Sequence, residues 1–208
     1  METGLWVLAV LAAAGWAAGG LGRWLLSRLC RGTRIPPPWC ELAVAILWTL
    51  AAAVTPPWWL AVPLALAWFA VLLTATDIAC RRLPDALTLS AYPVVAAGLV
   101  GSASVGPDAD LLQRSLVVAV VFLAVHAGVA VMAPAALGGG DVKLSGVVGA
   151  VLGAVSWSAA VLGVGVASAV TVVVAAVSRR RTAVPHGPGM LAAAWILSLA
   201  APGFPAGP

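Results

Sequence analysis

Apolar runs long enough to cross a lipid bilayer recur along the whole chain, and only 9% of its residues are charged. A soluble domain needs far more polar residues to cover its surface, so the sequence excludes a soluble domain of any size. The runs also lack the alternation of polar and apolar residues that a membrane β-barrel requires. The sequence therefore predicts an all-α polytopic membrane protein.

Eight apolar segments mark the expected transmembrane helices of a single transmembrane domain covering residues 1–208. They are 4–26, 41–55, 58–76, 86–103, 111–136, 142–155, 157–177 and 188–202. Proline and glycine pairs such as Pro56-Pro57 and Gly106-Pro107 fall between the segments, where they are expected to interrupt the helices. The fold prediction is a bundle of about eight helices.

The basic residues predict the orientation of this bundle. The first apolar run follows Glu2 and no basic residue, which favours a first transmembrane helix with its N-terminus outside over a cleaved signal peptide. Eight helices then place both termini outside and leave Arg114 as the one basic residue of eleven on that side. The cytoplasmic set is Arg23, Arg28, Arg31, Arg34, Arg81, Arg82, Lys143, Arg179, Arg180 and Arg181. Topology thus explains the positive charge without a nucleic-acid partner.

The three cysteines, Cys30, Cys40 and Cys80, do not indicate a metal site. No two of them have CxxC spacing, and all three fall on or near the cytoplasmic side, where a disulfide is disfavoured. A structural zinc ion needs four ligands, and the sequence offers no such set. We predict no metal and no other cofactor.

Two aspartates, Asp77 and Asp141, are predicted to lie at the cytoplasmic boundary of the bilayer. Two adjacent carboxylates share a proton, so that one can activate a water molecule while the other polarises a carbonyl group, as in an aspartic protease. The glycines before Asp141 would allow unusual backbone dihedrals and close approach of a substrate. Two alternatives remain: a flexible loop with Asp141 capping a helix, and a transporter or channel that uses both aspartates as a proton or cation site.

The segments "DIACRRLPDALT" and "GGGDVKL" closely resemble the two signature motifs of the type IV prepilin peptidases, which are intramembrane aspartic proteases of the GxGD group. The matching residues are Asp77, Pro84 and Asp85 in the first motif, and Gly138, Gly140, Asp141, Lys143 and Leu144 in the second. The resemblance implies that Asp77 and Asp141 are the catalytic dyad. It also implies that the enzyme removes short basic leader peptides from prepilin or pseudopilin substrates, after a glycine, at the cytoplasmic face of the bacterial cytoplasmic membrane.

Other residues of the motifs are expected to have supporting roles. Asp85 is expected to order its loop or to cap the helix that follows. Lys143 could favour ionisation of the dyad, contact lipid phosphate or meet an acidic substrate residue. His126 is expected to be a buried, hydrogen-bonded residue without an acidic neighbour. The segment "VPHGPGMLAAAW" resembles a third family segment, Pro-Phe-Gly-Pro, and predicts a turn with a structural or substrate-groove role. Its residues are Pro185, His186, Gly187 and Pro188.

The N-terminal region departs from the longer family members, which also methylate the new pilin terminus. Residues 1–57 resemble a contracted version with two helices and a basic loop, and residues 58–208 correspond to a peptidase core of six helices. The two CxxC pairs of the longer members are missing, so we do not expect methyltransferase activity. An inactive homologue that acts as an assembly scaffold is a further alternative, in which aspartate variants would still support assembly.

Overall fold

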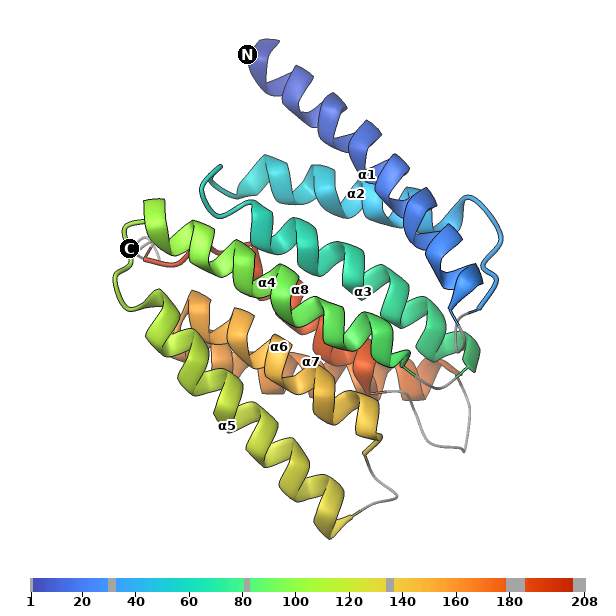
Figure 1. Cartoon of the computed structure of the whole chain (residues 1–208), viewed down its shortest axis with the longest axis vertical. Helices are drawn as coiled ribbons and strands as arrows, with labels where there is room; N and C mark the ends of the chain where they lie inside the picture. The colour runs from blue at the N-terminus through green and yellow to red at the C-terminus, as the bar shows by residue number, and fades with distance from the viewer. Residues whose placement is uncertain (1, 30–32, 81–82, 134–136, 179–185, 204–208) are drawn as a thin grey trace.

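The computed structural model of the chain describes residues 2–29, 33–80, 83–133, 137–178 and 186–203. These residues form eight α-helices and no strand (Figure 1), which confirms the predicted all-α fold. The helices are α1 Glu2–Arg28, α2 Trp39–Val54, α3 Ala61–Cys80, α4 Asp85–Val105, α5 Leu111–Met132, α6 Gly139–Val155, α7 Trp157–Ser178 and α8 Gly187–Ser198.

The helix boundaries differ from the predicted segments where hydropathy and helix formation diverge. The third segment was expected to end at residue 76, but α3 continues to Cys80, because no helix breaker occurs before Pro84. Asp77 therefore lies in the last turn of a helix. The last segment was expected to reach residue 202, whereas α8 ends at Ser198, shortly before Pro202. The residue before a proline is disfavoured in the α conformation, so a helix tends to end there.

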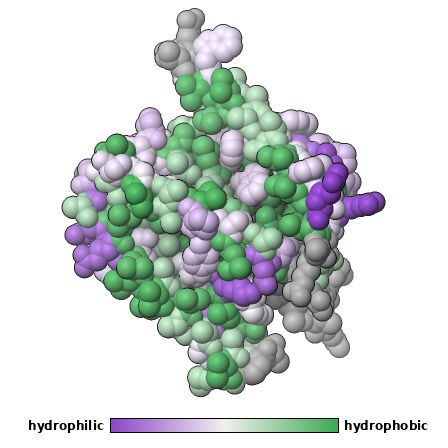
Figure 2. Space-filling model, viewed as in Figure 1, coloured by the Kyte–Doolittle hydropathy of each residue, from purple (hydrophilic) through white to green (hydrophobic). Residues whose placement is uncertain are grey.

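The outer surface of the bundle is apolar. Four of the described helices, α1, α3, α4 and α5, are long and apolar enough to cross a bilayer. Large apolar side chains such as Trp6 and Met132 are 73% and 87% exposed, as expected for residues that face lipid. Figure 2 shows hydrophobic side chains over much of one face, with hydrophilic ones gathered mainly towards the left and right edges, where helices end. Together these features describe a membrane protein.

Helix α6 is largely buried and lies against α4, α5, α7 and α8. Its glycines allow α5 to approach closely: a Cβ atom on Gly149 would lie 2.8 Å from the backbone oxygen of Val118, and one on Gly153 would lie 2.7 Å from that of Arg114. Small residues favour helix packing in membranes in this way. The position of α6 is therefore fixed on several sides, which also fixes the residues at its first turn.

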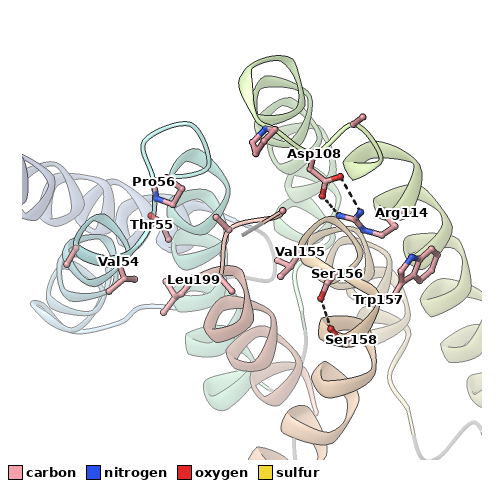
Figure 3. Close-up of a pocket in the computed structure, with 16 residues that line it drawn as sticks. Val54, Thr55, Pro56, Asp108, Arg114, Val155, Ser156, Trp157, Ser158 and Leu199 are labelled. Carbon is pink, nitrogen blue, oxygen red and sulfur yellow. Dashed lines mark hydrogen bonds and ion pairs between the residues drawn. The ribbon is translucent and has the colours of Figure 1, made fainter. Parts of the chain in front are cut away.

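An ion pair stabilises the C-terminal end of α6, which is the end farthest from Asp141. The guanidinium of Arg114 donates to Oδ2 of Asp108 at 2.6 Å and to the backbone oxygens of Gly153 and Ala154 at 3.0 and 2.8 Å. Figure 3 shows the two side chains pointing toward one another. One side chain thus satisfies two carbonyl groups that the end of a helix leaves without partners. Arg114 joins the α4–α5 connection to α6.

We expect the stabilising effect of this ion pair to depend on pH. The Arg114 hydrogen bond holds the pKa of Asp108 below its ordinary value, with burial opposing and the charge of Arg114 adding to the effect. A lowered folded-state pKa gives stability that is present above the unfolded pKa of about 3.9 and is lost as the pH falls through the folded value. Asp108→Asn should therefore cost about 1–3 kcal/mol near neutral pH. The difference from the wild type should vanish at low pH, as measured by unfolding in detergent micelles; a difference independent of pH would contradict this.

Candidate active site

Asp77 in the last turn of α3 and Asp141 in the first turn of α6 meet at the first residue of α8, Gly187. A Cβ atom built on Gly187 would lie 3.2 Å from Oδ2 of Asp77 and 3.2 Å from Oδ1 of Asp141. The two carboxylate oxygens are therefore no farther apart than twice that distance. Three segments that are distant in sequence thus bring two acidic groups to one place.

The two carboxyl groups differ in their surroundings. Asp77 is 7% exposed, and its Oδ2 is buried without a hydrogen-bond partner among the described residues. Asp141 is half-buried, and its backbone N–H donates to the oxygen of Gly138 at 3.0 Å. A buried polar atom without a partner costs roughly 1–3 kcal/mol, so Oδ2 of Asp77 is poised to bind a proton or a hydrogen-bond donor. This pair can share a proton, hold a water molecule or receive a peptide group.

The glycines before Asp141 act differently from the expectation. Gly138 has φ −74° and ψ 147°, and Gly139 already begins α6, so the segment does not use unusual backbone dihedrals. The alternative of a capping Asp141 is also wrong, since no side chain caps this helix. What the structure needs is space: a Cβ atom on Gly140 would lie 2.9 Å from Cβ of Leu83. Gly140 therefore lets the second motif pack against the first.

Lys143 pairs with Asp85, a contact that links the two motifs. Nζ of Lys143 donates to Oδ1 of Asp85 at 2.8 Å. Asp85 begins α4 after Pro84, and its side chain does not cap the helix, so the capping expectation is wrong. Tyr92, which the sequence reading overlooked, donates its hydroxyl to the backbone oxygen of Lys143 at 2.5 Å. Spacing could not reveal these contacts, because α4 and α6 meet only in the folded bundle.

We expect the Asp85–Lys143 pair to contribute little to stability. Both side chains are well exposed, at 51% and 43%, so solvent screens their attraction. A double-mutant cycle with Asp85→Asn and Lys143→Met should give a coupling of about 0.2–1 kcal/mol that declines with added salt. Unfolding in micelles at low and high salt measures it. A coupling above this range, unchanged by salt, would show that the pair is shielded from solvent.

The third segment lies beside the aspartates. His186 precedes α8, Gly187 is its first residue and Pro188 its second, as the predicted turn requires. Pro188 fits the first turn because that turn has no use for its backbone N–H. Burial lowers the pKa of His186, the nearby carboxylate of Asp141 opposes this, and the charge of His126 adds to it. Pro185 lies outside the described residues, as do Cys30, Arg31, Arg81, Arg82, Arg179, Arg180 and Arg181.

His126 is closer to the acidic pair than the sequence suggested. A ring nitrogen of His126 lies 2.7 Å from the backbone oxygen of Phe122, and the two rings stack with centroids 6.0 Å apart. His126 is half-buried, and when protonated it acts electrostatically on Asp141. The sequence could not show this, because α5 and α6 pack side by side only in the fold. Both histidines of the chain therefore lie within electrostatic range of Asp141.

Comparison with known families identifies the family of the chain. A model of the type IV leader peptidase family matches residues 64–176, more than half of the chain. The chain belongs to the type IV leader peptidase family. Both aspartates fall within the matched range, whereas Gly187 lies beyond it. Neither the comparison with curated proteins nor that with solved structures gave a match.

Membership makes the protein a peptidase, and prepilin-type proteins are the general substrates of its family. Cys40 of this leader peptidase is buried and Cys80 is exposed, and neither forms a disulfide. The described residues contain no group of three or more His, Cys, Asp or Glu side chains that could hold a metal ion.

A large cavity of the peptidase lies away from the aspartates. It has a volume of about 1130 Å³ and lies at the opposite end of the bundle, where Thr55, Asp108, Ser156 and Leu199 line it (Figure 3). Val155 ends α6 and Asp141 lies near its beginning, so roughly 20 Å of helix separates the cavity from the acidic pair. Its charged groups, Asp108 and Arg114, are already paired.

Proposed function

We propose that this protein is an aspartic endopeptidase of the cytoplasmic membrane and that Asp77 and Asp141 form its catalytic dyad. The observation that carries the proposal is the convergence of the two carboxyl groups at Gly187, each with an oxygen 3.2 Å from one point. Family membership supports peptide hydrolysis over proton or cation transport. Peptide hydrolysis requires groups that activate water and polarise the carbonyl group, and two converging carboxyl groups can do both.

The dyad would hydrolyse a peptide bond with one shared proton. The ionised carboxylate accepts a proton from water while the hydroxide attacks the scissile carbonyl carbon, and the protonated carboxyl group donates its proton to the carbonyl oxygen. The tetrahedral diol then collapses: the C–N bond breaks, the amine nitrogen takes a proton from one carboxyl group, and one diol hydroxyl gives its proton to the other carboxylate as the carboxylic acid forms, so that the dyad again holds one shared proton. The two protonation states belong to the pair and not to one residue. No proton or electron is left over.

Prepilin-type proteins with short basic leaders are the proposed substrates, cut after a glycine at the cytoplasmic face of a bacterial membrane. The family supports the substrate class. The positive-inside bias supports the face, because it assigns the connections beside Asp77 and Asp141 to the cytoplasm. Residues 58–208 are proposed as the peptidase core, and the family match over residues 64–176 lies within this range. The proposal includes no methylation step.

The test is cleavage of a prepilin-type protein in a membrane. We expect co-expression with a candidate prepilin from the same genome to shorten the pilin by its leader, with the new N-terminus following a glycine, as mass spectrometry would show. A methyl group on the product would overturn the expectation of no methyltransferase activity. An unprocessed pilin for every candidate from that genome would contradict the proposed substrate class.

A further inference from the structure

A second, apolar groove begins next to the aspartates. It lies between α2, α3, α7 and α8, which are neighbours in the bundle (Figure 1), and has a volume of about 550 Å³. None of the residues that line it is charged. Those used below are Ala43 on α2, Thr74 and Ala75 on α3, and Pro188, Ala192 and Trp195 on α8.

One end of the groove coincides with the site. Thr74 and Ala75 lie within one helical turn of Asp77, and Pro188 follows Gly187, the residue that lies beside both carboxyl groups. From Pro188 the groove follows α8 as far as Ile196. Eight residues of helix correspond to about 12 Å, or roughly two turns. The groove therefore leads from the dyad into the apolar interior of the membrane.

The lining indicates what the groove can hold. Ala43 and Ala192 project little from their helices, and small residues of this kind allow another helix to approach closely in a membrane. Trp195, only 9% exposed, lines the same groove, and its Nε1–H is buried without an acceptor among the described residues. A buried N–H without a partner is unfavourable. The uncharged lining with its small residues favours an apolar helix as the occupant.

We propose that this groove binds the first turns of the substrate's membrane helix, the segment that directly follows the scissile bond. The inference rests on the proposed function, which places that bond at Asp77 and Asp141. A helix seated along α8 would end near Pro188, and the extended chain before it would then cross the dyad at Gly187. Fixing the helix in this way fixes which peptide bond reaches the carboxyl groups, and such positioning contributes to catalysis.

Filling the groove should separate helix binding from the chemistry. Ala192→Phe is expected to lower kcat/KM at least about tenfold for a full-length prepilin in liposomes. A short soluble peptide that spans the scissile bond but lacks the helix should be cut at the wild-type rate. The matched control is Ala96→Phe, in a separate apolar groove between α4, α5 and α6 that does not reach the aspartates. This variant should cut both substrates like the wild type.

Several outcomes would overturn the proposal. Normal cleavage of the full-length prepilin by Ala192→Phe would mean that lipid, and not the substrate helix, occupies the groove. An equal loss of cleavage in Ala96→Phe would show that the added ring disturbs the bundle in general. If Ala192→Phe also lowers cleavage of the short peptide, a second variant on α2, Ala43→Phe, is measured instead. The proposal then requires Ala43→Phe to lower cleavage of the full-length prepilin and to leave cleavage of the short peptide unchanged. The proposed function fails separately, if Asp77→Asn still cuts the short peptide.

A photo-crosslinking residue in the first two turns of the substrate helix provides a second test, independent of activity. Mass spectrometry should find the crosslinks on α2 and α8, at residues near Ala43 and Ala192. Crosslinks confined to α4 and α5, or to lipid alone, would overturn the proposed docking site even if cleavage is normal.

Discussion

Asp77→Asn and Asp141→Asn are each expected to lower kcat/KM for leader cleavage by at least about 10²–10⁴-fold, the contribution typical of positioned acid and base groups. Asparagine keeps the shape of the side chain but can neither take a proton from water nor share one with its partner. Because the two carboxyl groups act as one unit, the double variant should be no less active than either single variant. Cleavage of a prepilin in liposomes, followed by mass, measures the loss.

The matched control is Asp110→Asn, which removes an exposed acidic group from the α4–α5 connection. It should cut the substrate at the wild-type rate. All variants should be folded, as shown by their unfolding temperatures in micelles. If either dyad variant retains wild-type activity, the assignment of Asp77 and Asp141 as catalytic residues is wrong; if pili still assemble with both variants, the scaffold alternative gains support.

Gly187→Ala is expected to reduce cleavage by about 10–100-fold, because misplacement of reacting groups by about 1 Å costs this much. The added Cβ atom would lie 3.2 Å from an oxygen of each aspartate, tighter than ordinary van der Waals contact, and would push the carboxyl groups aside. Gly187→Val should abolish activity, since its larger side chain enters the space between them. Initial rates on the short soluble peptide report on the dyad without the apolar groove.

Gly139→Ala supplies the control for the glycine substitution. A Cβ atom on Gly139 would meet nothing within 4 Å, and alanine favours the helix that begins there. This variant should therefore keep wild-type activity and stability. An equal loss of activity in Gly139→Ala and Gly187→Ala would mean that any added methyl group in these segments is harmful. The short distance between Gly187 and the two carboxyl groups would then not explain the effect.

Hydropathy was sufficient to predict the helices of this protein, because eight apolar segments separated by prolines, glycines and charges admit few other folds in a membrane. The ends of α3 and α8 were misplaced, since hydropathy changes where a helix enters a polar region and not where its backbone stops. Asp77 shows the consequence: it is the fourth residue from the end of α3 and is largely buried, whereas the sequence placed it just after the apolar segment.

The members of the site could be predicted from the motifs, but their contacts could not. The motifs singled out Asp77, Asp141 and Gly187 without showing that the three lie together, and the pairing of Lys143 with Asp85 and the electrostatic effect of His126 on Asp141 depend on how α4 and α5 pack against α6. Gly140 was assigned to backbone freedom, but it serves close packing against Leu83. A glycine in a sequence does not reveal which of these two properties is used.

The three-segment construction of the site determines when the protein can become active during its own synthesis. Asp77 and Asp141 leave the ribosome well before Gly187, and α8 supplies both the residue between the carboxyl groups and one wall of the apolar groove. Chains are built and begin to fold from the N-terminus. A nascent chain that has not yet inserted α8 carries both aspartates but no complete site. Under the proposed mechanism, cleavage should therefore begin only after α8 has inserted.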